Sequence, residues 1–167
     1  PRSTRAAVAD EAWNAPPMAP AGADSVGRFL RIRTFVSWMH EQDIRESVAR
    51  PAPDAALQKP EARLSLDEIE TMMGFVVAKR GGAPDGARVE IQLTGPMART
   101  IRVAVDGRAA VVPDFGGAEP TTVIRMDGWQ FTRLCGGRPL GAVRSVVIEF
   151  EGDAEVGQRI VENLGYV

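Results

Sequence analysis

The sequence has very few of the residues that build disulfides and metal sites. Among its 167 residues there is one cysteine, Cys135, and one histidine, His40. A single cysteine cannot form an intramolecular disulfide, and it also excludes a zinc site made of several thiolates. So little cysteine is typical of proteins from a reducing compartment, and we therefore expect a cytoplasmic protein.

Long apolar runs and an excess of positive charge are also missing. No stretch approaches the roughly 18 apolar residues that a membrane-spanning helix needs, and the first residues show no signal-peptide pattern. The chain has 20 Lys and Arg residues against 22 Asp and Glu, which gives a net charge of −2. This balance argues against a nucleic-acid binder with a basic surface. We expect neither a nucleic acid nor a membrane as a partner.

What is present is the composition of a globular protein with two segments. Hydrophobic residues make up 44% of the chain and charged residues 25%, as in ordinary soluble domains. The segment 51–60 is rich in Pro and Ala and reads as a linker. We predict a helical part with its linker over residues 1–58 and an α+β domain over residues 59–167. Because the chain begins at Pro1 without an initiator Met, we expect it to be a fragment or a processed form.

The first part contains one well-marked helix that ends before Pro51. Asp24 or Ser25 can cap its start, and apolar side chains then recur with a period of 3.6 residues. So broad an apolar face indicates packing against other helices or a large partner. Its members are Val26, Phe29, Leu30, Ile32, Phe35, Val36, Met39, Ile44 and Val48.

The second part begins with a helix and continues with strands. Ser65 and Glu68 have the spacing of a capping box, which predicts that the helix starts there. Gly81 can end it in the left-handed conformation. Alternating apolar and polar residues then predict the strands, and Asp106-Gly107 is a strong hairpin signal. The expected strands are 89–93, 101–105, 108–112, 121–126 and 146–150.

Two further helices are marked by caps. Asp127 with Gln130 predicts the start of a short helix between the last two strands, and Asp153 precedes the final helix. The order of elements favours an α+β fold, with an antiparallel sheet covered by helices.

His40 is the residue most open to a functional interpretation. A lone helical histidine commonly faces solvent or bonds a neighbour, here Asp43 three residues on. The alternative is a metal ligand, because neutral imidazole is a common ligand of zinc. The zinc-protease pattern His-Glu-x-x-His is absent, because Ile44 stands where the second histidine would be. Carboxylates would have to supply most of the coordination.

The run Arg31–Arg45, with Trp38-Met39-His40-Glu41-Gln42-Asp43-Ile44-Arg45, resembles the signature helix of the mycothiol-dependent maleylpyruvate isomerase family. The segments 76–96, 125–138 and 150–164 also resemble typical phrases of that family. The resemblance implies the end of a DinB-like four-helix metal-binding domain, followed by a sterol-carrier-like α+β domain. It also implies that the N-terminal helices of the bundle are missing from this chain.

The resemblance implies a metal site and a thiol cofactor. In the family, a His on an earlier helix, an acidic residue and a second His four positions later hold a divalent metal, zinc or a similar ion. His40 matches the second His, Val36 stands where the acid is expected, and the earlier His would lie upstream of Pro1. Asp43 would orient the imidazole from behind. The metal would bind mycothiol as a thiolate, for isomerisation or thiol transfer on a small electrophilic substrate.

An arginine of the second domain would suit the carboxylates of such a substrate. Arg133 and Arg138 are the candidates, although the arginine-rich composition favours two solvated surface residues. Cys135 follows an apolar position and has no histidine left to activate it, so we expect a core residue.

Three functions remain open. The first is the metal- and mycothiol-dependent enzyme. The second is a non-catalytic family member in which Val36 has removed the metal and the α+β domain binds a small apolar or acidic ligand. The third is a module for partner assembly, because the apolar face of the first helix must be covered, and a homodimer is one way to do so.

Overall fold

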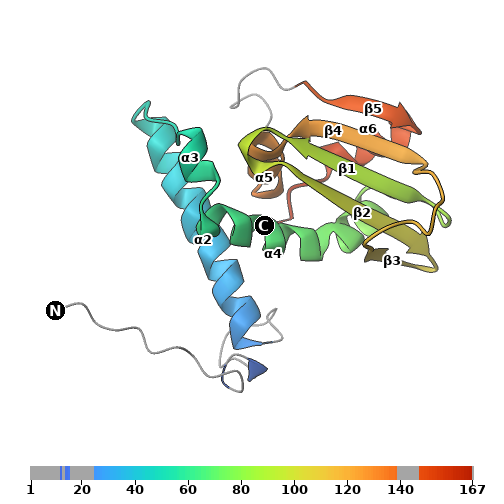
Figure 1. The fold of residues 1–167 in the computed structure, drawn as a ribbon, viewed down its shortest axis with the longest axis horizontal. Helices are drawn as coiled ribbons and strands as arrows, with labels where there is room; N and C mark the ends of the chain where they lie inside the picture. Colours follow the sequence, from blue (N-terminus) through green and yellow to red (C-terminus); the bar gives the residue numbers. More distant parts are fainter. Residues whose placement is uncertain (1–11, 13, 16–24, 139–146, 167) are drawn as a thin grey trace.

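The computed structural model describes residues 12, 14–15, 25–138 and 147–166. A long helix lies at one end of an α+β layer in which helices pack on a five-stranded sheet (Figure 1). None of the helices in these ranges is long and apolar enough to span a membrane. The helices are α2 (Val26–Ser47), α3 (Asp54–Leu57), α4 (Pro60–Phe75), α5 (Gly128–Cys135) and α6 (Ala154–Glu162), with a π-helical turn η1 (Val76–Arg80) and a 3-10 turn η2 (Gly95–Met97).

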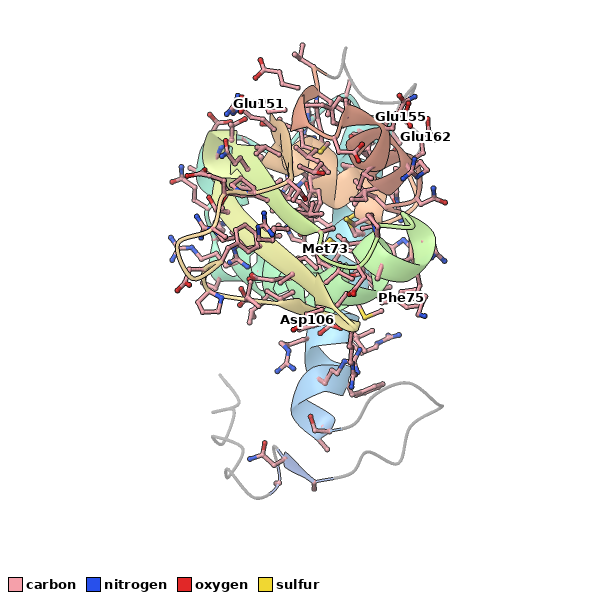
Figure 2. All side chains as sticks on the ribbon, turned by 90° about the vertical axis from the view of Figure 1, so that its right-hand side faces the viewer. Met73, Phe75, Asp106, Glu151, Glu155 and Glu162 are labelled. Carbon is pink, nitrogen blue, oxygen red and sulfur yellow. The ribbon has the colours of Figure 1, made fainter. Side chains whose placement is uncertain are left out.

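Helix α2 begins where its sequence predicts. The Ser25 hydroxyl accepts a hydrogen bond from the Arg28 amide at 3.2 Å, whereas Asp24 lies outside the described residues. Only part of the expected apolar face is covered, because Leu30, Ile44 and Val48 are exposed. In Figure 2 the N-terminal half of α2 extends beyond the rest of the folded layer. The buried residues of α2 are Gly27, Phe35, Trp38, Met39 and Gln42.

The structure differs from two expectations at the start of α4 and in the linker before it. It begins at Pro60, so Ser65 lies inside the helix and donates to the Glu61 carbonyl at 2.8 Å instead of capping the start. Proline is well placed at the first helical position, where its missing N–H has no partner to lose. The capping-box prediction at Ser65 and Glu68 is therefore wrong. The predicted linker is also not entirely extended, because it contains the short helix α3.

The end of this helix differs from the prediction as well. Gly81 has φ −81°, and the left-handed conformation belongs to Gly82, at φ 64°. Gly81 is needed for a different reason, because a Cβ at this position would lie 2.4 Å from Cγ1 of Ile160. Its small size allows α6 to pack closely on the end of the α4–η1 helix.

The sheet has the strand order β3-β2-β1-β4-β5. Three neighbouring pairs are antiparallel, as expected, but β1 and β4 are parallel, with Ile91 opposite Ile124. The sheet is mixed because the connection after β3 returns past β2 to the far side of β1. The strands are β1 (Arg88–Thr94), β2 (Arg99–Asp106), β3 (Arg108–Val111), β4 (Thr122–Asp127) and β5 (Glu149–Gly152). Strand β5 starts later than predicted, and Val146 lies outside the described residues.

One hydrophobic core joins the sheet to its helices. One face of the sheet carries buried side chains, while the other carries polar pairs such as Arg102–Glu90. On α4, Met73 is fully buried and Phe75 is half exposed (Figure 2). Phe35 of α2 belongs to the same cluster of buried residues as Ile91 of β1. The predicted boundary between residues 58 and 59 stays a prediction, although the core includes residues from both sides of it.

Candidate functional site

Two arginines of the C-terminal layer meet two carboxylates of α2. The Arg133 guanidinium donates to Asp43 Oδ1 at 2.5 Å and to Glu46 Oε2 at 2.7 Å. Arg138 donates through Nε to Asp43 Oδ1 at 3.1 Å and through Nη2 to Asp43 Oδ2. We call Asp43, Glu46, Arg133 and Arg138 the arginine–carboxylate cluster. It fastens the C-terminal half of α2 to α5.

Arg133 is not the solvated surface residue that the composition favoured. Its side chain is 3% exposed, and its Cζ lies 5.5 Å from the ring centroid of Trp129. Arg138 is also largely covered, with 23% of its side chain exposed. A buried guanidinium needs carboxylate partners to offset its desolvation, and Asp43 and Glu46 supply them. The structure therefore brings the two candidate arginines together, but around the chain's own carboxylates.

The cluster changes the titration of Asp43. The hydrogen bond from Arg138, helped by Arg133 and opposed by partial burial, lowers the pKa of Asp43 from 3.8 to about 2. His40 is 68% exposed, and its Nδ1 lies 3.7 Å from Asp43 Oδ2. Because both oxygens of Asp43 accept from arginines, its main partners are the guanidinium groups and not the imidazole.

The described residues do not fit a zinc ion at His40. Four residues before it stands Val36, which has no donor atom, and the neighbouring carboxylate of Asp43 is taken by arginines. Within residues 12, 14–15, 25–138 and 147–166, no group of three or more His, Cys, Asp or Glu side chains could hold a metal. The described residues therefore provide one ligand, His40, of the three that the resemblance implies.

Cys135 lies in the core, as expected. Its side chain is fully buried, and burial raises the pKa of the thiol well above its usual range. A buried thiol with a raised pKa is a poor nucleophile at neutral pH. Cys135 is therefore a packing residue.

A groove of about 1150 Å³ lies beside the cluster. Leu57, Met126 and Trp129 give it an apolar lining, and Glu46 belongs both to the groove and to the cluster. The segments that form it are the end of α2, the Pro-rich stretch with α3, the turn η2, the end of β4 with the start of α5, and the start of β5. The lining residues are Glu46, Pro51, Ala52, Pro53, Asp54, Leu57, Thr94, Pro96, Arg125, Met126, Asp127, Trp129, Gln130, Val147 and Glu149.

Sequence reasoning missed the groove because its walls come from five separate segments. The Pro-rich composition predicts only a linker, whereas Pro51 and Pro53 form part of one wall. The one local signal was the cap at Asp127, which is confirmed: Asp127 Oδ1 accepts from the Gln130 amide at 3.1 Å. This cap starts α5 at the edge of the groove and places Trp129 there.

Comparisons with known proteins identify the family of the C-terminal part. A solved structure described as "UbiJ-SCP2 Ubiquinone synthesis protein" is similar at 15% sequence identity and a TM-score of 0.43, over 63% of this chain and 96% of that one. No curated protein matches the chain. The family model of the MDMPI C-terminal domain, where MDMPI stands for the maleylpyruvate isomerase, matches residues 63–159, which is more than half of the sequence. The chain therefore belongs to the maleylpyruvate isomerase C-terminal domain family.

Proposed function

We propose that this chain is a ligand-binding member of the maleylpyruvate isomerase family and that a small organic molecule binds in the groove beside Trp129. The observation that carries the proposal is the groove itself, about 1150 Å³ with Leu57, Met126 and Trp129 in its lining. Sites for small molecules are concave, mostly apolar and of a few hundred to about 1,000 Å³. The groove is large enough to take such a ligand along part of its length.

Contacts within the chain hold two walls of the groove in place. Glu46 at the end of α2 is fixed by Arg133, and Trp129 packs edge-to-face on Trp38 with ring centroids 5.6 Å apart. A preformed site loses less conformational entropy on binding than one that must first be ordered. The contact between α2 and α5 thus supports ligand binding, because it fixes two residues that line the groove.

Metal-assisted chemistry on mycothiol, by isomerisation or thiol transfer, is the second candidate. It is favoured by the resemblance around His40 and by the exposure of the imidazole, which leaves it accessible to a metal. Val36 and the arginine-bound Asp43 provide no further ligand. This activity would depend on ligands from outside the described residues, so the groove supports ligand binding better.

The binding proposal is tested with Nile red, a neutral apolar dye that fluoresces when it leaves water. We expect saturable binding to the full chain. Thr94 is exposed at the edge of the groove, so Thr94→Trp should fill part of the volume and weaken binding about tenfold, a loss of about 1.4 kcal/mol. Thr100→Trp is the matched control, because Thr100 is exposed on β2 and does not line the groove. Equal affinity of both variants, or no saturable binding, would overturn the proposal.

A further inference from the structure

We infer that the groove selects a small organic cation, an amine or quaternary ammonium ion that carries an apolar group. The inference rests on the proposed function, because it names the class of ligand for the same groove. Its starting point is the sign of the charges around an apolar lining. Among the lining residues that the structure describes there are four carboxylates and one cationic side chain; the carboxylates are Glu46, Asp54, Asp127 and Glu149, and the cation is Arg125.

The charge of Arg125, the one cation among the described lining residues, is already compensated. Arg125 donates through Nη1 to Glu149 at 2.9 Å and to Glu151 at 3.3 Å, and through Nε to Gln92 at 3.0 Å. Glu151 belongs to β5 and is labelled in Figure 2. Two carboxylates therefore share one guanidinium group. Arg125 has little positive charge left for an anionic ligand.

The cluster arginines are not available to an anion either. Arg133 is engaged by Asp43 and Glu46, and Arg138 by Asp43. A ligand carboxylate would have to displace Asp43, whose lowered pKa shows how strongly the guanidinium groups favour its charged form. This argues against the acidic ligand that was one of the alternatives from the sequence.

Two carboxylates of the groove have no cationic partner. In the part of the chain that the structure describes, neither Asp54 nor Asp127 forms an ion pair. Asp127 accepts only the neutral amide of Gln130, and Asp54 is exposed in the first turn of α3. They come from different walls of the groove, α3 and the junction of β4 with α5. A cation between these walls would gain from both charges.

Trp129 adds apolar surface to the lining. Arg133 lies over its ring, with Cζ 5.5 Å from the centroid, and Trp38 packs against the same ring. The ring therefore offers the ligand apolar contact, and the carboxylates supply the attraction for its charge. Apolar contacts with Leu57 and Met126 would take the uncharged part of the ligand. An apolar body with a positive charge matches both the lining and the unpaired carboxylates.

The test compares three probes of similar size as competitors of Nile red on the full chain: phenyltrimethylammonium, its neutral isostere tert-butylbenzene, and benzoate. We expect phenyltrimethylammonium to displace the dye at about tenfold lower concentration than tert-butylbenzene, and benzoate to be the weakest. Added NaCl should weaken the cation and leave the neutral probe unchanged, because salt screens exposed charges.

Two substitutions assign the effect to named carboxylates. Asp54→Asn and Asp127→Asn each remove one charge, and Asn keeps the cap of α5 because its side-chain oxygen still accepts the Gln130 amide. Each should weaken phenyltrimethylammonium about threefold, and the pair about tenfold, with tert-butylbenzene unaffected. Asp85→Asn is the matched control, because Asp85 is an exposed turn residue outside the groove that also accepts a backbone amide, from Gly107.

The outcomes separate the two proposals. If Nile red binds as expected but all three probes compete equally, the selection of a cation is wrong and the ligand-binding groove stands. If Asp85→Asn weakens the cation as much as the groove variants do, the attraction is a property of the acidic surface and the inference fails. Weaker Nile red binding by Thr94→Trp than by Thr100→Trp, together with the expected probe order, supports both.

Discussion

Arg133 and Asp43 are 90 residues apart in the sequence and form a charge-assisted hydrogen bond of 2.5 Å between α5 and α2. A second contact, in which α2 supplies the arginines and α4 the carboxylate, holds the N-terminal half of α2. There Glu68 of α4, buried with a raised pKa, lies 3.6 Å from both Arg28 and Arg31. Helix α2 thus offers cations near its start and carboxylates near its end. These ion pairs favour the direction in which α2 packs.

The first prediction concerns the energy of this contact. Asp43→Ala should lower the free energy of unfolding by about 1–3 kcal/mol, because it leaves Arg133 buried with Glu46 as its one remaining carboxylate. Arg133→Met should cost less, since the carboxylates are about one-third exposed and can be rehydrated. The double variant should cost less than the sum of the two single ones, which denaturant titrations of all four proteins measure.

A matched control for this cycle lies on the same helix. Glu41 pairs with Arg45 at 2.8 Å, but neither partner is buried as Arg133 is: Glu41 is 54% and Arg45 37% exposed. Exposed pairs contribute about 0.2–1 kcal/mol. Glu41→Ala should therefore change the stability much less than Asp43→Ala. Equal losses would show that the cluster is no more than a surface ion pair.

The second prediction concerns the stability of the protein at low pH. The pKa of Asp43 is lowered to about 2 in the folded protein, against 3.8 as its ordinary value. A depressed pKa contributes stability above the ordinary value, and the protein loses this contribution as the pH falls from about 4 towards 2. Denaturant titrations across this range should show a smaller decline for Asp43→Asn than for the unmodified chain. An identical decline would mean that Asp43 gains nothing from the arginines.

The helix caps show how much of the fold can be predicted from the sequence. Ser25, Asp127 and Asp153 each cap a helix by accepting the amide three residues on, and all three follow from local spacing. Ser65 and Glu68 have the same spacing but lie inside α4. There Glu68 serves a long-range contact with α2, which local spacing does not reveal.

Prediction of the arginine–carboxylate cluster would likewise require knowledge of contacts between residues far apart in the sequence. The sequence identified Asp43, Arg133 and Arg138 as residues of interest, but not that they bind one another, because the residues of each pair are 90 or more positions apart. The parallel pairing of β1 with β4 was missed for a similar reason. It depends on where the chain returns after β3, and alternation within a strand determines faces but not neighbours.

The third prediction concerns the domain boundary. A chain of residues 59–167 should still unfold cooperatively, because its sheet and helices α4, α5 and α6 form most of the core. Its melting temperature should be lower, because it loses the buried contacts of Phe35, Trp38 and Met39 and the partners of Arg133. A thermal melt followed by circular dichroism measures both. A non-cooperative melt would contradict an independent domain, and an unchanged melting temperature would contradict a stabilising role for α2.

The last prediction concerns zinc. The chain should bind zinc weakly, because His40 has Val36 one turn before it and an arginine-bound carboxylate after it. Val36→Glu places a carboxylate four residues before the imidazole, and side chains at this spacing lie on one face about 5–6 Å apart at Cβ. We expect calorimetric titration to show zinc binding tighter by about tenfold, or about 1.4 kcal/mol. Zinc should then also raise the melting temperature, because it binds the native state.

Thr34→Glu provides the matched control for this experiment. It adds the same charge to α2, but six residues before His40 and therefore about 120° away around the helix, where one ion cannot reach both side chains. It should leave the zinc affinity unchanged. If the unmodified chain already holds zinc with submicromolar affinity through His40, or if Val36→Glu gains no more than Thr34→Glu, then position 36 does not share a metal site with His40. The match of this helix to the family's metal-binding pattern would then be wrong.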